Sequence, residues 1–199
     1  MASLEIDSNK LGKDGKPTLR ATTKQRLPPS ILSKLMICPA YISRQLSVQD
    51  RFRFLGFHAL AVQKVIARHL KAGYILEKIE AKSGFGRIDL IFKIENSKRK
   101  RQVEVKSGKN IYLYAKYQAA LYWNGTDELV VSNSISDTVL PLEFIMNTQE
   151  RAEATKNLII NRPSEAAMKF MPHEEICRIC ANTDCTFLPN RIGDSKGEA

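Results

Sequence analysis

The sequence predicts an α/β fold in which a small mixed sheet is flanked by helices. The spacing of hydrophobic residues is helical up to about residue 71 and changes to a strand-like spacing at residue 74. The expected order is two helices, three strands, a helix, a strand and a final helical region, which is typical of a sheet covered by helices. A length of 199 residues suffices for one domain with a full hydrophobic core and is short for two.

Two helices are expected before the first strand. Apolar residues at helical spacing between positions 31 and 38 predict the first helix, with Ser30 as its N-cap and Pro39 at its end. The second helix has the stronger pattern, covers residues 51–71 and stops at Gly73. Its expected apolar face consists of Phe54, Phe57, His58, Leu60, Ala61, Val65 and Leu70.

Strands and helices alternate in the rest of the chain. We expect strands at residues 74–76, 87–92, 101–106 and 128–132. We expect helices at residues 112–123, 149–158 and 163–170. The strands 87–92 and 101–106 are joined by a basic turn and should therefore pair as a hairpin.

The chain is strongly basic, with a net charge of +10 and a pI of about 9.5. Residues 1–27 are expected to form a flexible basic tail that supplies three of these ten charges, so seven lie in the single domain expected at 28–190; residues 191–199 form a second flexible tail. A basic domain favours a polyanionic partner such as nucleic acid, although solubility alone also explains such a charge. A cytoplasmic location is expected, because no apolar run approaches the roughly 20 residues of a membrane span and no secretory signal is visible.

The predicted hairpin carries a catalytic pattern. Asp89 lies on its first strand, and Glu104 and Lys106 lie two residues apart on its second strand, so their side chains leave the same face. Two carboxylates among apolar neighbours favour a divalent cation, Mg²⁺ or Mn²⁺, that can activate water against a phosphodiester. The alternative is an exposed aspartate and an ordinary Glu–Lys pair, because charged residues are common in hairpins.

Four cysteines enclose this region in the sequence. Cys38 precedes the hairpin, and Cys177, Cys180 and Cys185 follow it with the spacing C-x2-C-x4-C. Disulfides are unusual inside cells, so a metal site is favoured. Spacing alone leaves structural zinc and an iron–sulfur cluster both open. Either would tie the first helix to the C-terminal segment.

These motifs, in this order, resemble a known nuclease group. Gly86-Arg87-Ile88-Asp89, then Glu104-Val105-Lys106, then Gln118 and Tyr122 four residues apart resemble the RecB-like form of the PD-(D/E)xK superfamily. With the four cysteines, the sequence resembles the CRISPR-associated RecB-like exonuclease family, the Cas-four-like nucleases, which includes viral relatives. The resemblance covers nearly all of residues 30–190.

The resemblance implies a restriction-endonuclease-like fold and a 4Fe–4S cluster on the four cysteines. It further implies hydrolysis of DNA by a single-strand exonuclease of 5′-to-3′ polarity with endonuclease activity in some cases. The role would be capture of CRISPR spacers with partner integrase proteins, or processing of viral DNA in the host cytoplasm. Two other readings stay open: a junction-resolvase-type endonuclease, and a DNA-binding module with a cluster or zinc and no catalysis.

Roles follow for individual residues. Asp89, Glu104, His58 and the Val105 carbonyl are the expected metal ligands, with His69 as the competitor of His58. Lys106 is expected to assist the attacking water. The residues expected to contact DNA are Gln118, Tyr122, the basic-turn residues Lys98, Arg99, Lys100 and Arg101, and, for base stacking, Tyr117 and Trp123.

Overall fold

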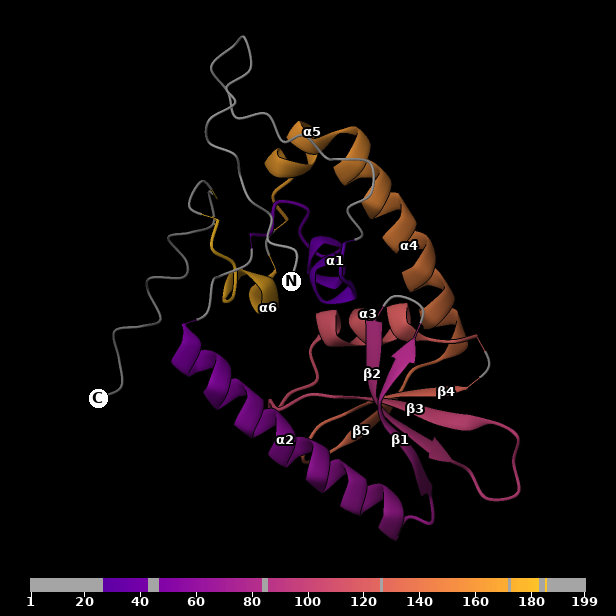
Figure 1. Cartoon of the computed structure of the whole chain (residues 1–199). Helices are drawn as coiled ribbons and strands as arrows, with labels where there is room; N and C mark the ends of the chain where they lie inside the picture. Colours follow the sequence, from indigo (N-terminus) through magenta and orange to yellow (C-terminus); the bar gives the residue numbers. More distant parts are fainter. Residues whose placement is uncertain are drawn as a thin grey trace.

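The computed structural model describes residues 27–42, 47–83, 86–125, 127–171, 173–182 and 185. It confirms the α/β class, with a five-stranded mixed sheet and helices on both of its faces (Figure 1). The tails predicted at 1–27 and 191–199 lie outside the described residues, except for Leu27. That residue is half-buried and packs against the core around α1.

The sheet has the strand order β1-β2-β3-β4-β5, in which only β3 and β4 are parallel. The strands are β1 (Ile75–Ser83), β2 (Gly86–Lys93), β3 (Lys100–Val105), β4 (Glu128–Ser132) and β5 (Asp137–Val139). The predicted β2–β3 hairpin is confirmed, with Leu90 opposite Val103. The sequence did not predict β5, which is three residues long, and it gave β1 only its first residues. Both are edge strands, where charged residues hide the strand pattern.

The second helix, α2 (Val48–Lys71), starts before the predicted residue 51, because Ser47 supplies the N-cap. The Ser47 Oγ accepts a hydrogen bond from the Asp50 N–H at 3.1 Å. The chain leaves the helix at Ala72, and Gly73 takes the positive φ of 86° expected there.

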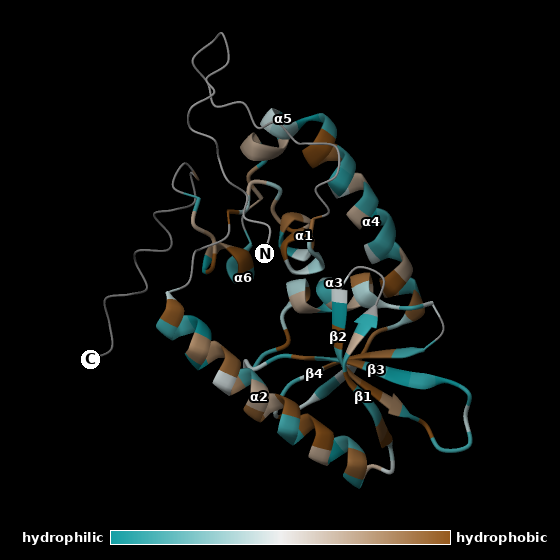
Figure 2. Cartoon of the chain, viewed as in Figure 1, coloured by the Kyte–Doolittle hydropathy of each residue, from teal (hydrophilic) through white to brown (hydrophobic). Residues whose placement is uncertain are grey.

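The predicted apolar face of α2 is wrong at Phe54, Phe57, Leu60 and Leu70, all of which are exposed. Phe57 and Leu60 are 65% and 55% exposed, whereas Ala61, Val65 and His69 are buried. Only the C-terminal half of α2 lies against the sheet (Figure 1), although apolar residues recur along its length (Figure 2). Helical spacing therefore identified the helix correctly but could not tell how much of it reaches the core.

The first helix, α1 (Pro29–Leu35), has Pro28 at its N-cap without a side-chain cap, so Ser30 lies inside the helix and its predicted capping role is wrong. Proline at the first helical position fixes φ near the helical value and lacks the N–H that a cap would satisfy. The helix ends at Leu35, ahead of Pro39, as expected from the helix-breaking effect of proline.

The remaining helices are α3 (Leu113–Tyr122), α4 (Leu142–Asn161), α5 (Pro163–Met168) and α6 (Glu174–Cys177). α3 and α5 agree with prediction to within two residues. α4 is longer than predicted, since it begins directly after Pro141 and buries Ile145 and Thr148 in its early turns. α6 has only four residues and was not predicted.

Three apolar clusters hold these elements together. One joins α2 to one face of the sheet through Val65, Phe92 and Val103. The second joins α3 and the start of α4 to the other face. The third surrounds α1 and combines α3, α4 and the C-terminal segment near Cys180.

The C-terminal segment returns to the residues that follow α1. The Ala181 N–H donates to the Ile42 carbonyl at 2.8 Å, and the Asn182 side-chain amide donates to the Ala40 carbonyl at 2.8 Å. α6 is also tied to α3, since the Glu175 carboxylate accepts a hydrogen bond from the Leu113 N–H at 2.8 Å. The segments expected to be joined by a metal thus already meet through protein contacts.

Candidate active site

A cavity of about 670 Å³ lies where α1, α2, the hairpin, α3 and the turn after α6 converge. A volume of this order suits a ligand of the size of a nucleotide. The charged, amide and tyrosine residues that line it are Lys34, Tyr41, His58, Asp89, Glu104, Lys106, Asn110, Tyr112, Tyr114, Gln118 and Arg178. All three predicted catalytic residues therefore share one cavity.

Asp89 enters this cavity from β2. Its Oδ2 accepts a hydrogen bond from the Val105 N–H at 2.7 Å, and its Oδ1 lies 3.5 Å from the Nε2 of His58 on α2. The hydrogen bond that the His58 ring donates to the Asp89 carboxylate is the main cause that raises the pKa of His58, against the opposing effect of burial. The ring of Phe54, one turn earlier, stacks on His58 at 6.4 Å between centroids.

Glu104 enters from β3 and is 3% exposed. Its Oε1 accepts hydrogen bonds from the Lys106 Nζ at 2.8 Å and from the Gln118 Nε2 at 2.9 Å. Lys106 also donates to the Gln118 Oε1 at 2.9 Å, which closes a triangle of three side chains. The prediction that Glu104 and Lys106 leave the same face is confirmed.

Burial raises the pKa of Glu104 to about 7, with a further contribution from the negative charge of Asp89, while Lys106 acts in the opposite direction. The second carboxylate oxygen, Oε2, is buried and has no hydrogen-bond partner among the described residues. A buried carboxylate with one unsatisfied oxygen is costly, and the cost falls when a cation binds it.

Gly86 and Tyr122 interlock at the edge of the site. A Cβ on Gly86 would collide with the edge of the Tyr122 ring, so only glycine fits at this position. The Gln118 Nε2 lies 3.4 Å from the Tyr122 hydroxyl, a long contact that joins the two residues on one face of α3. The glycine of the motif thus has a packing reason.

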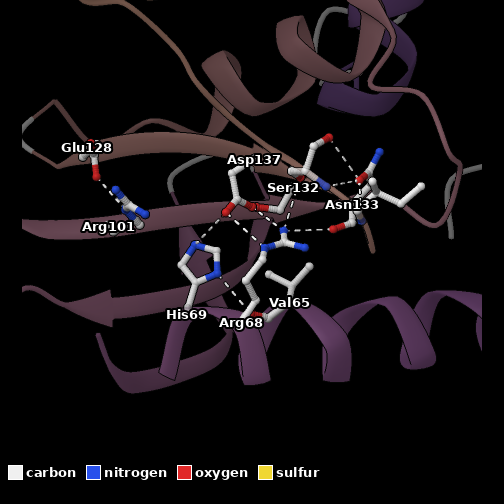
Figure 3. Close-up of polar contacts among 10 residues, drawn as sticks. Val65, Arg68, His69, Arg101, Glu128, Ser132, Asn133 and Asp137 are labelled. Carbon is white, nitrogen blue, oxygen red and sulfur yellow. Dashed lines mark hydrogen bonds and ion pairs between the residues drawn. The ribbon is translucent and has the colours of Figure 1, made fainter. Parts of the chain in front are cut away.

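His69, the competitor of His58, lies outside the cavity. It is 1% exposed, its Nδ1 lies 3.0 Å from the Val65 carbonyl, and its ring stacks on Phe92 at 4.7 Å. Its Nε2 lies 4.0 Å from the Asp137 carboxylate, which also binds Arg68 (Figure 3). This cluster attaches α2 to β5, and His69 is a core residue of that attachment.

The predicted metal ligands do not yet form a coordination group. As the side chains stand, the described part of the chain contains no set of three or more His, Cys, Asp or Glu residues placed to hold a metal ion. The reason is visible at the carboxylates, since Glu104 is engaged by Lys106 and Gln118 and Asp89 by the Val105 N–H.

The cysteines show a similar partial assembly. None of the four forms a disulfide. Burial raises the pKa of Cys38, and the neighbouring Cys180 and Cys177 raise it further, so these three thiols lie within electrostatic range of one another. The Cys180 Sγ accepts backbone N–H bonds from Asn182 at 3.4 Å and from Ile42 at 3.5 Å. Cys185 is half-buried.

The predicted DNA-contacting residues divide into two groups. Gln118 lines the cavity. Tyr117 is instead buried against Phe144 and Arg151, and the indole N–H of Trp123 donates to the Asp127 carbonyl at 2.7 Å, so neither ring lines the cavity.

The basic turn also lies away from the cavity. Lys100 pairs with Glu77 at 2.7 Å and Arg101 with Glu128 at 2.6 Å (Figure 3), and Arg101 covers the ring of Tyr74 at 4.1 Å. From Lys93, the last residue of β2, to Asp89 is four residues, or about 13 Å along the strand. If this turn contacts DNA, it would therefore contact nucleotides distant from those beside Asp89 and Glu104.

Several cavity residues were not predicted as site residues. They are Lys34 on α1, Tyr41 in the segment after α1, Tyr112 and Tyr114 at the start of α3, and Arg178 in the turn after α6. No spacing in the sequence joins these segments, because they meet only through the third apolar cluster. Burial lowers the pKa of Lys34, and the nearby charge of Lys106 lowers it further.

Comparison of the chain with protein-family models, with curated proteins and with solved structures gives no match. Among the described helices, none combines the length and the apolar character needed to cross a membrane.

Proposed function

We propose that this chain is a metal-dependent nuclease that hydrolyses phosphodiester bonds in DNA, with single strands as the substrate. The observation that carries the proposal is Glu104, a buried carboxylate with an unpartnered oxygen, in one cavity with Asp89, His58 and Lys106. This combination of acidic, basic and amide groups suits water-mediated attack on a phosphodiester. The basic character of the chain supports a polyanionic substrate.

The residues present fit a divalent cation by their chemistry. Asp89 and Glu104 would hold Mg²⁺ or Mn²⁺ with His58, and the Val105 carbonyl is a further candidate ligand. When bound, such an ion polarises the phosphate and lowers the pKa of a bound water. Burial is the main cause of the raised pKa of Glu104, and a bound divalent cation would lower this pKa, as Lys106 already does in part.

The protein groups would act around that ion. Lys106, held between Glu104 and Gln118, brings a positive charge to the cavity and can stabilise charge that develops on the phosphate. Gln118 fixes the position of that ammonium group and would orient the strand. Tyr122, which was predicted to contact DNA, is 8% exposed and does not line the cavity, but its hydroxyl contacts the Gln118 amide at 3.4 Å. His58, whose pKa is raised by Asp89, is stacked on Phe54 and therefore restrained.

The finer parts of the proposal rest on the resemblance to Cas-four-like nucleases. They are a restriction-endonuclease-like fold, 5′-to-3′ exonuclease action with endonuclease activity in some cases, and a role in CRISPR spacer acquisition with integrase partners or in viral DNA processing. A 4Fe–4S cluster on Cys38, Cys177, Cys180 and Cys185 belongs to the same proposal. The proximity of three of these thiols and the N–H bonds to Cys180 support it, and zinc is the alternative occupant.

The test is cleavage of end-labelled single-stranded DNA with Mn²⁺ or Mg²⁺ by wild type and by Asp89→Asn, Glu104→Gln and Lys106→Met. We expect each variant to lose about 100-fold or more in rate. The matched control is Glu95→Gln, which changes an exposed carboxylate outside the cavity and should cut like wild type. Equal cutting by all variants would exclude this site. Absorbance near 400 nm on anaerobically purified protein would report a cluster.

A second candidate is a DNA-binding module without catalysis, retaining the cluster or zinc. The incomplete coordination group at Asp89 and Glu104 favours it. Wild-type protein that binds single strands but never cuts them with either metal would support this candidate. A junction-resolvase-type endonuclease would instead prefer four-way junctions over single strands in the same assay.

A further inference from the structure

Lys34 is a cation in the cavity for which the catalytic proposal gives no role. It extends from α1, and its Nζ lies 5.4 Å from the centre of the Tyr41 ring and 5.8 Å from that of Tyr114. It is half-buried, and no carboxylate among the described residues lies within ion-pair distance of it. The other two strong cations of the cavity do have such partners: Lys106 pairs with Glu104, and Arg178 with Glu174.

A partly buried ammonium group without an anion is unfavourable, because burial removes water that the two ring faces only partly replace. Lys106 lines the same cavity, and its positive charge adds repulsion. An anion that enters the cavity beside Lys34 would relieve both costs. The position is therefore suited to a negatively charged group of the ligand.

Aromatic rings surround the same position. Tyr112 and Tyr114 line the cavity, and their rings are 5.8 Å apart with an angle of 19° between the planes. Alternating cationic and aromatic groups are the chemistry by which proteins hold single strands, with phosphates on the cations and unstacked bases on the rings. A small inorganic anion would need the lysine but not the rings.

We propose that Lys34, framed by Tyr41 and Tyr114, binds a second phosphate of the substrate strand, next to the one cut at Asp89 and Glu104. The neighbouring base then lies against the Tyr112–Tyr114 pair. The inference rests on the proposed function, since it takes the strand to be the substrate of this cavity. It selects single-stranded DNA, because a base in a duplex has both faces covered by its neighbours.

The test compares Lys34→Met with wild type in binding to single-stranded DNA in EDTA, where no cutting occurs. Methionine keeps an apolar stem between the two tyrosine rings and removes the charge. The matched control is Lys64→Met, an exposed lysine of α2 outside the cavity. We expect Lys34→Met to reduce the slope of log affinity against log salt by about 0.7, the value for one phosphate contact on a single strand. Lys64→Met should leave the slope unchanged.

A second measurement locates the contact. Single methylphosphonate linkages, which are uncharged, are placed one at a time along the strand. In wild type the linkage next to the cut site should weaken binding, and in Lys34→Met the same linkage should have no further effect. Lys34→Arg, which keeps the charge, should behave like wild type and guards against loss of folding in the methionine variant.

An unchanged salt slope in Lys34→Met, in a protein whose wild type cuts DNA, would overturn this inference and leave the nuclease proposal intact. Loss of cutting in Asp89→Asn, together with the reduced salt slope in Lys34→Met, would support both the nuclease proposal and this inference. Failure of wild type to bind single strands at all would overturn both.

Discussion

Replacement of Glu104 by glutamine should stabilise the metal-free protein above pH 7, although it removes a proposed metal ligand. Burial raises the pKa of this carboxyl from 4.5 to about 7. In the folded protein Glu104 therefore keeps its proton up to about pH 7, whereas the unfolded chain releases it near pH 4.5. The contribution of Glu104 to the free energy of unfolding is therefore fully present below pH 4.5. It is lost as the pH rises from there through 7.

The magnitude follows from the shift. At about 1.4 kcal/mol per pKa unit, the loss between pH 4.5 and 7.5 is about 3 kcal/mol. Glutamine has nearly the same shape and no charge to desolvate, so Glu104→Gln should lack this loss. For a chain of this size the difference corresponds to roughly 6–12 °C in Tm at pH 8.

The assay is urea unfolding in EDTA at pH 5, 6, 7 and 8, for wild type, Glu104→Gln and the exposed-site control Glu95→Gln. Titration of groups that do not interact with Glu104 is common to all three proteins and cancels in the differences. His58, whose pKa is raised mainly by Asp89 and least by Glu104, contributes a smaller difference of its own. The wild type should lose stability relative to Glu104→Gln as pH rises, while the control follows wild type. Parallel curves for wild type and Glu104→Gln would refute the reasoning about the buried carboxylate.

Metal should then remove most of the difference in stability between the two proteins. At pH 8 a divalent cation at 100 times its Kd stabilises the protein that binds it by about 2.7 kcal/mol. Wild type should gain this with Mn²⁺ and Glu104→Gln should gain little. Equal gains in both proteins would place the ion elsewhere.

Two further variants test the packing around the site. Gly86→Ala should destabilise the protein by roughly 1–3 kcal/mol, because the new Cβ would meet the Tyr122 ring. In a double-mutant cycle with Tyr122→Ala, the part of this cost that comes from the collision should disappear. Costs of the two substitutions that simply add would contradict the collision. Arg151→Met should cost roughly 1.5–3 kcal/mol in urea unfolding, because the guanidinium donates to the Met36 carbonyl at 2.8 Å and to the Tyr117 hydroxyl at 3.2 Å. A change below about 0.5 kcal/mol would show that water replaces those bonds.

The hairpin and its catalytic side chains could be predicted from the sequence because the signals are local. Alternation fixes which residues of a strand share a face, and a short basic turn fixes the pairing partner, so Asp89, Glu104 and Lys106 were expected together. α3 was similarly visible, and the spacing of Gln118 and Tyr122 gave their common face.

The buried face of α2 and several cavity residues could not be predicted from the sequence, because they depend on packing between distant segments. Leu60 and Leu70 were assigned to the same apolar face as Val65, yet only Val65 is buried, because the face that meets the core carries Ala61, Val65 and His69. Lys34 and Tyr114 meet in the cavity through the position of α1 on α3, and no spacing records that position. The structure lends no support to the base-stacking roles given to Tyr117 and Trp123, since neither ring lines the cavity.

The hydrogen bond between Ala181 and Ile42 has a consequence for protein synthesis. The two segments that it joins are about 140 residues apart in the chain, and ribosomes add roughly 5–20 residues per second. The hairpin with both carboxylates therefore leaves the ribosome several seconds before Arg178 and Ile179, which complete the wall of the cavity. During that interval the nascent chain holds Asp89 and Glu104 without the residues that complete the cavity around them. A cell that makes this protein is thus expected to meet the complete cavity only once translation has passed residue 182.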